Sequence, residues 1–526
     1  MTRADLVIRG RLLTVDPSRP SARALAVRDG RIVAVGAAHE MPPGPVTDVG
    51  DACVMPGFVE AHGHFVGDAV VSCLVDIRPV TVPDAARVVA LIRETVAGRG
   101  AAYFSGWDAL LQKGLPEPTL AWLDEIAPHT PLTIMHNSGH IVYFNSVAAR
   151  LAGIGAHTPD PPGGRFGRTP AGELDGTAYQ QPAANLVLEP LLREVIPPAI
   201  VPALKAAAER ANAAGVTMMS EMGLNPVYRL ALDAARDLIT LRLRLYEVST
   251  PERRSAAVPG QGDDLIRQIG VKMWADGSPW VGNLAATFPY LDNAATRLLG
   301  VPGGRSEANY SAAELLEISR AYFAAGWQLA CHANGDQAVE LVLDAWERLL
   351  RDAGRPDHRL RLEHCSAMRP EQFARAHALG VTCSLFPDHV YYWGEVLADD
   401  LFGPEVADRW APIAPALRSG MRVSLHNDSP VTPVEPLRNI SVAATRISRR
   451  GRRFGEAIGV EQAIRAQTVD AAYQLFADDV TGSLEVGKYA DLVVLGADPR
   501  EVDPAAIADI PVIATYLQGR QVSQRA

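Results

Sequence analysis

The chain has 526 residues, of which 48% are hydrophobic and 21% charged, with a formal net charge of -10. This composition is typical of a large globular protein with a sizeable core, and its acidic balance argues against nucleic acid as a partner. No run approaches the roughly 18 apolar residues of a membrane helix, and the N-terminus lacks the charged start and apolar stretch of a signal peptide, so we expect a cytoplasmic protein without a membrane partner.

The two ends of the chain carry strand patterns of their own. Residues 6–15 and 24–35 alternate in strand fashion around the turn Asp29-Gly30, and residues 491–495 and 512–522 look similar. We predict that residues 1–55 and 480–526 jointly form a small β-sandwich domain beside the main domain, residues 56–479.

Within the main domain, short apolar runs alternate with segments of helical periodicity. The predicted strands are residues 57–64, 215–221, 241–248, 269–274, 326–332, 359–364, 380–385 and 421–426. Helical periodicity ending near a glycine marks residues 204–214, 312–325, 337–350 and 370–379. Alternating strands and helices indicate a parallel sheet, and eight such units close into a barrel. We therefore predict an α/β fold: a (β/α)8 TIM-type barrel with a small β-sandwich domain formed from both termini.

Two connections are too long for ordinary barrel loops. The first predicts an inserted subdomain at about residues 75–200, with helical pieces near residues 82–98 and 183–195. The second, residues 278–309, follows the fourth predicted strand. Both leave from the carboxyl ends of strands, so we expect them to supply lids and substrate walls.

Five predicted strand ends carry side chains that bind metals. His62 and His64 form a His-x-His pair, and because side chains alternate along a strand, both imidazoles point the same way. The other strand ends carry Lys272, His332, His364 and Asp428. Each residue alone has a structural interpretation, but active sites of such barrels lie at the carboxyl ends of the strands. The ordered set therefore predicts one metal centre.

Longer motifs make the chain resemble the amidohydrolase superfamily. They lie at residues 54–64, 158–165, 271–278, 331–338, 363–364, 428–431 and 481–492. Within the superfamily the chain resembles amidohydrolase family 3, the YtcJ-like branch that includes N-substituted formamide deformylases. The resemblance runs nearly end to end and implies a metal-dependent amidohydrolase, which acts on carbon-nitrogen bonds other than peptide bonds.

The resemblance also implies a centre of one or two divalent ions, most often Zn2+. Position by position, the binuclear pattern assigns His62, His64 and Asp428 to one ion and His332 and His364 to the other. It makes a carbamylated Lys272 the bridge, since adding CO2 turns a lysine cation into an anionic oxygen ligand. The alternative is a one-metal site in which an unmodified Lys272 pairs with Asp276 or with a substrate carboxylate.

The same pattern suggests roles in catalysis and substrate binding. Hydroxide formed from metal-bound water is expected to attack the carbonyl, with Asp428 passing its proton to the departing nitrogen. His140 and His389 match recurrent family positions, and either could stabilise the oxyanion or orient substrate. Aromatic residues at the rim are predicted to line an apolar pocket or to cover the barrel mouth: Trp107, Trp280, Tyr391 and Trp393.

Two positions depart from the family pattern. Asn334 stands where an aliphatic residue is expected, and His426 and Asn427 precede Asp428 where a plainer small residue is usual. Both add polar groups close to the metals, so specificity should not be taken from any one relative. His426 is open to two interpretations, a partner of a metal ligand or a hydrogen-bonded structural histidine.

Three functions remain open from the sequence. The main prediction is a hydrolase of a neutral or apolar small-molecule substrate, namely an N-substituted amide, formamide or carbamate. The second is a one-metal deaminase or cyclic-amide hydrolase, for which Asp336 is a loosely placed acid. The third is a catalytically silent binding protein, which metal content would distinguish. Because the chain resembles homodimeric relatives, a homodimer is also expected.

Overall fold

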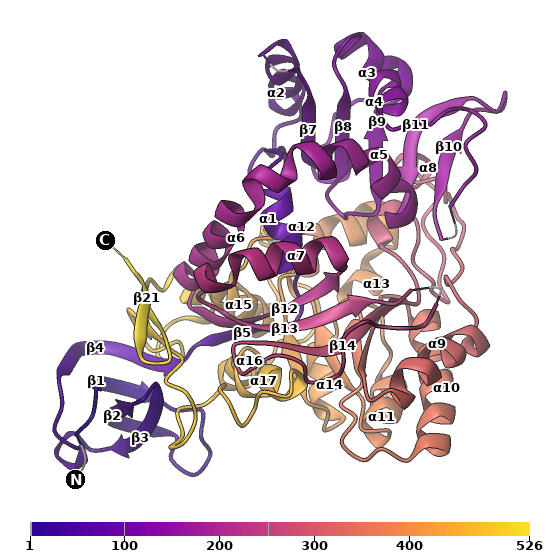
Figure 1. The fold of residues 1–526 in the computed structure, drawn as a ribbon. Helices are drawn as coiled ribbons and strands as arrows, with labels where there is room; N and C mark the ends of the chain where they lie inside the picture. The colour runs from indigo at the N-terminus through magenta and orange to yellow at the C-terminus, as the bar shows by residue number, and fades with distance from the viewer. Residues whose placement is uncertain (1–2, 99, 162, 251, 526) are drawn as a thin grey trace.

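A computed structural model describes residues 3–98, 100–161, 163–250 and 252–525 (Figure 1). At its centre, eight parallel strands follow the order β18-β17-β16-β15-β14-β13-β12-β5. They are β5 (Phe58–Glu60), β12 (Val216–Leu224), β13 (Arg242–Val248), β14 (Ile266–Trp274), β15 (Gln328–Ala333), β16 (Arg361–His364), β17 (Thr382–Leu385) and β18 (Val423–Leu425). Each overlaps one predicted strand, so the predicted α/β barrel is confirmed.

The first and last barrel strands are joined through Gln467 and Glu60. Within the described residues no ladder pairs β5 with β18. Instead, the carbonyl of the buried Gln467 accepts the Val59 N–H at 2.9 Å, and its Nε2 donates to the Leu425 carbonyl at 2.9 Å. Glu60 Oε1 accepts the backbone N–H of Asn427 at 2.6 Å. These bonds join β5 to β18 and to the segment that follows β18.

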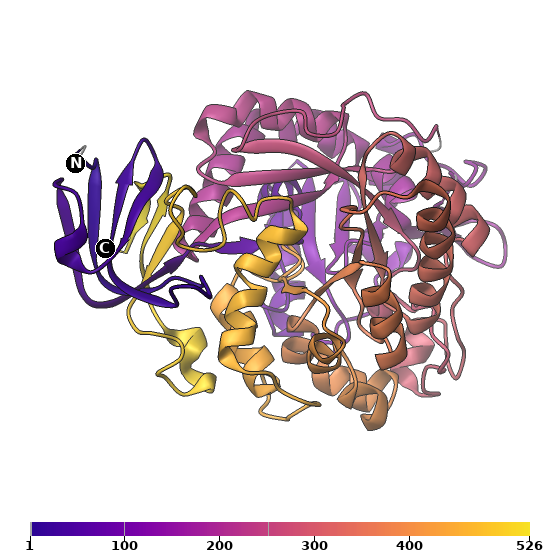
Figure 2. The same cartoon turned by 90° about the horizontal axis from the view of Figure 1, so that it is seen from below.

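Amphipathic helices surround the barrel (Figure 2). They include α6 (Ile196–Ala213), α7 (Pro226–Ala235), α9 (Ala312–Ala324), α10 (Asp336–Ala353), α11 (Pro370–Ala378), α14 (Ile413–Arg418), α15 (Pro436–Thr445), α16 (Val460–Ala466) and α17 (Val469–Gln474). In α10 the buried residues Val339, Val342, Leu343 and Trp346 recur at helical spacing and pack inward. Among the described helices, none has the length and apolar character needed to cross a membrane.

Both ends of the chain contribute to one seven-stranded sheet, in the order β21-β20-β19-β4-β1-β2-β3. Its strands are β1 (Leu6–Leu13), β2 (Ser21–Arg28), β3 (Arg31–Gly36), β4 (Val46–Pro56), β19 (Leu492–Leu495), β20 (Val512–Leu517) and β21 (Arg520–Gln524). In Figure 2 the indigo and yellow strands lie side by side, next to the barrel. Because β4 ends at Pro56 and β5 begins at Phe58, this sheet leads directly into the first barrel strand.

The first insertion folds as a separate sheet that projects from the barrel (Figure 1). Its order is β10-β11-β9-β8-β7-β6, with β6 (Val75–Asp76), β7 (Ala102–Trp107), β8 (Leu132–His136), β9 (Ile141–Phe144), β10 (Arg165–Arg168) and β11 (Leu174–Tyr179). Helices α2 (Ala85–Gly98), α3 (Leu120–Ile126), α4 (Ser146–Leu151) and α5 (Gln180–Glu194) accompany it. The second insertion holds the short helices η3 (Pro279–Val281) and α8 (Ala294–Leu298).

A buried ion pair joins the terminal sheet to the barrel. Arg242 in β13 and Asp491 just before β19 are both fully buried, and Arg242 Nη2 lies 3.2 Å from Asp491 Oδ1. The same oxygen accepts the backbone N–H of Gln518 at 2.9 Å. Removing one member of a buried pair leaves the other charge uncompensated, which is more costly than losing a surface pair.

We expect Asp491→Ala to lower the free energy of unfolding by about 3–5 kcal/mol, because it leaves the Arg242 guanidinium buried without a counter-charge. Urea unfolding followed by circular dichroism measures the change. Glu501→Ala is the matched control, since it removes the partner of the half-exposed Arg11 and should barely shift the midpoint. Equal midpoints for the two variants would contradict this role of Asp491.

Candidate metal centre

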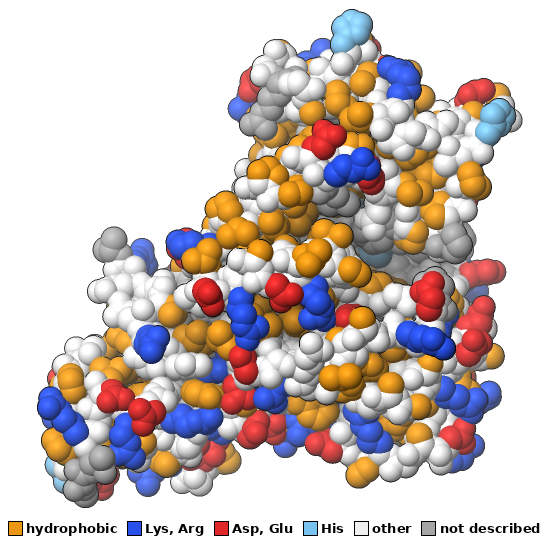
Figure 3. Space-filling model, viewed as in Figure 1, with side chains coloured by type: hydrophobic (Ala, Val, Ile, Leu, Met, Phe, Trp, Pro, Cys, Tyr) orange, Lys and Arg blue, Asp and Glu red, His pale blue; other side chains and the backbone are white. Residues whose placement is uncertain are grey.

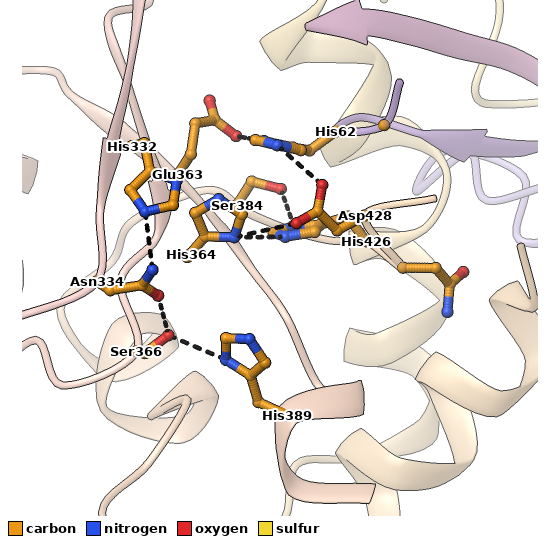
Figure 4. Close-up of polar contacts among 12 residues, drawn as sticks. His62, His332, Asn334, Glu363, His364, Ser366, Ser384, His389, His426 and Asp428 are labelled. Atoms are coloured by element: carbon orange, nitrogen blue, oxygen red, sulfur yellow. Dashed lines mark hydrogen bonds and ion pairs between the residues drawn. The ribbon is translucent and has the colours of Figure 1, made fainter. Parts of the chain in front are cut away.

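The residues predicted as metal ligands converge at the carboxyl ends of the barrel strands, and Figure 4 labels His62, His332, His364 and Asp428 among them. They come from the segment after β5, from β14, β15 and β16, and from the segment after β18: His62, His64, Lys272, His332, His364 and Asp428. The side chains of His64 and Asp428 are 28% and 14% exposed, whereas the others are buried. In Figure 3 the surface is hollowed between the inserted subdomain and the barrel, with a histidine visible at its floor.

Three ligating atoms face one another at the open side of this cluster. Asp428 Oδ1 lies 3.4 Å from His62 Nε2 and 3.5 Å from His64 Nε2. Although Asp428 Oδ1 is buried, no side chain or backbone group donates a hydrogen bond to it within the described part of the chain. This buried carboxylate oxygen accepts no hydrogen bond and lies beside two imidazole nitrogens. Together the three atoms form a set of ligands that suits a divalent cation. The residues present therefore fit the implied metal.

Carboxylates orient both imidazoles of the His-x-His pair. Glu363 Oε2 lies 2.6 Å from His62 Nδ1 and accepts its proton, which leaves the lone pair of His62 Nε2 facing Asp428. Glu221 Oε1 lies 3.8 Å from His64 Nδ1 and accepts the backbone N–H of Gly223 at 2.7 Å. The contact with Glu363 explains why His62 Nε2 has no proton to give to Asp428.

The remaining histidine ligands are buried and neutral. His332 Nε2 lies 3.1 Å from the carbonyl of Gly277, so Nε2 carries the proton and Nδ1 is free for a cation. The ring centroids of His332 and His364 are 4.4 Å apart. Burial lowers the pKa of both imidazoles well below the ordinary value, with a further contribution from neighbouring imidazoles and Lys272. Neutral imidazole is the form that binds metals.

The predicted bridge, Lys272, lies within the same cluster. Its Nζ is 3.2 Å from His62 Nε2, and the side chain is buried. Burial lowers the pKa of Lys272 to about 8, despite the opposing influence of Glu363 and Asp428. The alternative partner, Asp276, is held elsewhere: its carboxylate accepts backbone N–H groups from Asn334, Gly335 and Ala285.

A series of polar contacts lies between His332 and His389, which is in α12 (Asp388–Glu395) (Figure 4). Asn334 Nδ2 donates to the carbonyl of Gly277 at 3.1 Å, the same oxygen that accepts from His332 Nε2, and Asn334 Oδ1 accepts from Ser366 Oγ at 2.5 Å. Ser366 Oγ is in turn 3.2 Å from His389 Nδ1. The proton of Ser366 goes to Asn334, so the donor to His389 Nδ1 is Trp410 Nε1, at 3.3 Å. Because an indole N–H can only donate, His389 carries its proton on Nε2.

The inserted subdomain brings His140 to the centre. The ring centroids of His140 and His332 are 6.0 Å apart. Gln180 Oε1 lies 2.9 Å from His140 Nδ1 and accepts its proton, which leaves the lone pair on Nε2. The two predicted catalytic histidines thus have opposite hydrogen-bonding character, since His389 offers a donor and His140 an acceptor.

The structure brings three of the four predicted substrate-binding aromatics together. Trp280 stacks on Trp393 with centroids 5.0 Å apart and meets the His389 ring edge-on at 5.1 Å. Tyr391 packs against the same cluster. Trp107 lies apart from them, in the core of the inserted sheet. The three tryptophans are at most 2% exposed, so their rings pack against protein in this structure.

Sequence reasoning did not assign a role to the residues that orient the ligands. Glu363 and Arg361 occupy alternate positions of β16, and their side chains form a fully buried ion pair with Arg361 Nε 2.9 Å from Glu363 Oε1. Glu221 is likewise buried near the end of β12. The sequence did carry a signal for this pair: charged residues stand at alternate positions of a predicted central strand, where residues are normally apolar.

Comparison with known proteins agrees with this geometry. A sequence model of the amidohydrolase family matches residues 46–523. The chain is 29% identical to the protein LONG AFTER FAR-RED 3 of Arabidopsis thaliana, over 99% of this chain and 91% of that protein. It is 28% identical to an N-substituted formamide deformylase of Arthrobacter pascens, over 98% of this chain and 97% of that enzyme.

A solved structure shares the fold. An uncharacterized metal-dependent hydrolase from Pyrococcus horikoshii OT3 superposes with a TM-score of 0.75 at 21% identity. The superposition covers 95% of this chain and 99% of that one. Barrel, terminal sheet and insertion therefore form one architecture common to both proteins.

We expect Glu363→Gln to weaken metal retention by about 10–100-fold, because an amide orients His62 less firmly than a carboxylate does. Metal content after dialysis against graded chelator concentrations measures the effect. Glu371→Gln, at the surface beside Arg369, is the control and should retain metal as the unmodified protein does. A thermal melt of each variant separates metal loss from unfolding, and unchanged retention in a folded Glu363→Gln protein would refute the prediction.

Proposed function

The chain belongs to the amidohydrolase family, and we propose that this metal-dependent hydrolase cleaves the C–N bond of a neutral or apolar N-substituted amide, formamide or carbamate. The observation that carries the proposal is the approach of Asp428 Oδ1 to within 3.5 Å of the Nε2 atoms of His62 and His64. Similarity to an N-substituted formamide deformylase over nearly the whole chain supports this substrate class.

The charges at the centre support a neutral substrate. Arg361 and Lys272 are both buried, and Arg361 is paired with Glu363. Neither side chain therefore presents a positive charge to an anionic group entering from the open side of the cluster. The imidazoles of His140 and His389 are neutral, because burial lowers the pKa of each, that of His389 to about 3.

We propose that the centre binds one or two Zn2+ ions, since imidazole and carboxylate donors suit zinc. A divalent cation in such a site supplies a water nucleophile near neutral pH and polarises the carbonyl under attack. Lys272 is proposed as a carbamylated bridge. Its depressed pKa increases the share of neutral amine, whose nitrogen attacks CO2 and loses a proton to give an anionic N-carboxylate.

Asp428 is proposed to move the proton that hydrolysis requires. Burial opposes ionisation of its carboxyl, but its pKa still lies below the ordinary range among the side chains of this cluster. The carboxylate is therefore available as a base at neutral pH. An amide nitrogen leaves only when protonated, so a base that accepts a proton from water and delivers it to this nitrogen serves both steps.

The opposite characters of His389 and His140 suit the two ends of an amide. The Nε2–H of His389 is a neutral donor for the carbonyl oxygen, whose negative charge grows as the nucleophile adds. The bare Nε2 of His140 can accept the N–H of a substituted amide. Together they would orient the amide plane at the centre.

The deaminase alternative lacks support at Asp336. Its carboxylate accepts the backbone N–H and the hydroxyl of Thr287, at 2.8 and 2.6 Å, and pairs with Arg369 at 2.9 Å. These contacts occupy the group that would have to protonate a leaving amine. A catalytically silent protein should have lost ligands, whereas the six predicted ligand positions all retain theirs.

We expect Asp428→Asn to reduce kcat for N-substituted formamides by about 10²–10⁴-fold, because an amide cannot accept the proton. Steady-state kinetics with formamide, acyl-amide and carbamate substrates measures this, with metal content determined on the same samples. Asp336→Asn is the matched control and should keep most of the activity if the deaminase alternative is wrong. Substantial activity in a metal-loaded Asp428→Asn enzyme would count against Asp428 as the base.

We expect the unmodified protein to hold close to two metal ions per chain and Lys272→Ala to lose both the second ion and activity, because the bridging anion is gone. Elemental analysis and a hydrolysis assay give the two readings. Removing metal with a chelator should abolish activity, and Zn2+ with bicarbonate should restore it in the unmodified protein alone. One ion per chain with an active Lys272→Ala variant would eliminate the carbamate bridge.

A further inference from the structure

A buried imidazole outside the family's ligand pattern faces the metal centre. His426, directly after β18, stacks on His62 with ring centroids 4.7 Å apart. Its Nε2 lies 3.2 Å from His364 Nδ1 (Figure 4). His62, His364 and His426 each offer one ring nitrogen within 4.8 Å of the other two, and all three side chains are buried. This geometry allows a single cation to contact three imidazoles.

The hydrogen bonds of Gln474, Ser424 and Ser384 determine which ring nitrogen of His426 carries the proton. Gln474 Nε2 donates to the carbonyl of Cys383 at 2.8 Å, so its Oε1 is turned the other way and can only accept. Ser424 Oγ lies 2.7 Å from that oxygen and 2.8 Å from Ser384 Oγ. Since a hydroxyl has one proton, Ser424 gives it to Gln474 and must accept from Ser384.

The same argument places the proton of the His426 imidazole. Ser384 Oγ, whose proton goes to Ser424, lies 2.7 Å from His426 Nδ1 and can only accept there. His426 therefore carries its proton on Nδ1, and the lone pair of Nε2 faces His364 Nδ1. A buried lone pair needs either a donor or a cation. His62 cannot be the donor, because its single proton is on Nδ1 and given to Glu363. The two candidates are a proton on His364 Nδ1, 3.2 Å away, and a cation held between the two nitrogens.

We propose that His426 is a metal ligand, with its Nε2 joining His62 Nε2 and His364 Nδ1 around one divalent cation. The proposal rests on the metal centre proposed above and adds an inner position to it. Asp428 Oδ2 lies 4.0 Å from His364 Nδ1, so a carboxylate stands beside the three imidazoles. Three neutral imidazoles and a carboxylate are donors that zinc, nickel and copper accept.

This inner position differs from the outer one formed by His62, His64 and Asp428. The outer set is partly exposed, whereas the inner set is buried. Because His62 has only one free nitrogen, an ion at either position uses the same lone pair. The two sets are therefore alternative positions for the ion that His62 binds, and His426 extends the centre toward the barrel interior.

The decisive experiment is a crystal structure of the zinc-loaded protein, with the ion located by anomalous diffraction. The expected result is His426 Nε2 at about 2.0–2.1 Å from the ion, the usual zinc–imidazole distance. An ion bound by His364 through Nε2, with His426 outside coordination distance, would overturn the proposal. In that case His426 Nε2 would only accept a hydrogen bond from His364 Nδ1.

Variants test the same point in solution. We expect His426→Ala to weaken metal retention by at least about 100-fold, beyond the range usual for a residue that merely orients a ligand, and to change the visible absorption spectrum of the Co2+-loaded protein. Ser384→Ala keeps the imidazole but frees its tautomer, so a loss of about 10-fold is expected. His377→Gln, at an exposed histidine, should match the unmodified protein in both measurements.

The outcomes separate this proposal from the function proposed above. An unmodified protein that takes up no metal would refute the metal-dependent function as well. Normal metal uptake and an unchanged Co2+ spectrum in His426→Ala would refute the role of His426 alone. If His426→Ala does not fold, the zinc-loaded structure of the unmodified protein still decides the question.

Discussion

The metal centre depends on a buried ion pair inside the barrel. Arg361 forms an ion pair with Glu363, and Glu363 accepts a hydrogen bond from Nδ1 of His62. His62 Nε2 is therefore unprotonated and faces Asp428. Arg361 also donates to the carbonyl of Ala61 at 3.0 Å, which ties β16 to the end of β5 across the barrel. Burying an ion pair costs free energy, so this pair serves to position His62 rather than to stabilise the fold. Without it, the first ligand would have no defined tautomer.

Burial gives the surrounding groups their chemical states. It lowers the pKa of the imidazoles of His332 and His364, so they are neutral ligands. The pKa of Asp428 lies below its ordinary range, even though burial opposes its charge. The low-dielectric interior, which disfavours charged side chains, therefore contains both neutral nitrogen ligands and one anionic oxygen. That combination attracts a divalent cation and leaves a base beside it.

The groups proposed to contact substrate come from different parts of the chain than the ligands. His140 belongs to the inserted subdomain and His389 to α12 at the rim, whereas the ligands lie in or directly after barrel strands. Trp280 of the second insertion packs against His389, so the insertions and the catalytic rim form one unit. Substrate preference can therefore change through the insertions while the ligand set stays constant.

The sequence by itself determined the eight barrel strands and the order of the ligands after them, because strand periodicity and residue type are local properties. It also marked Asn334 and His426 as unusual. Only the tertiary structure decided which atoms meet: that Gln467 joins β5 to β18, that Glu363 orients His62, and that Trp107 lies apart from the centre. Such contacts join residues far apart in the chain, and hydrogen-bond direction, which sets the tautomer of His426, exists only once those residues are packed together.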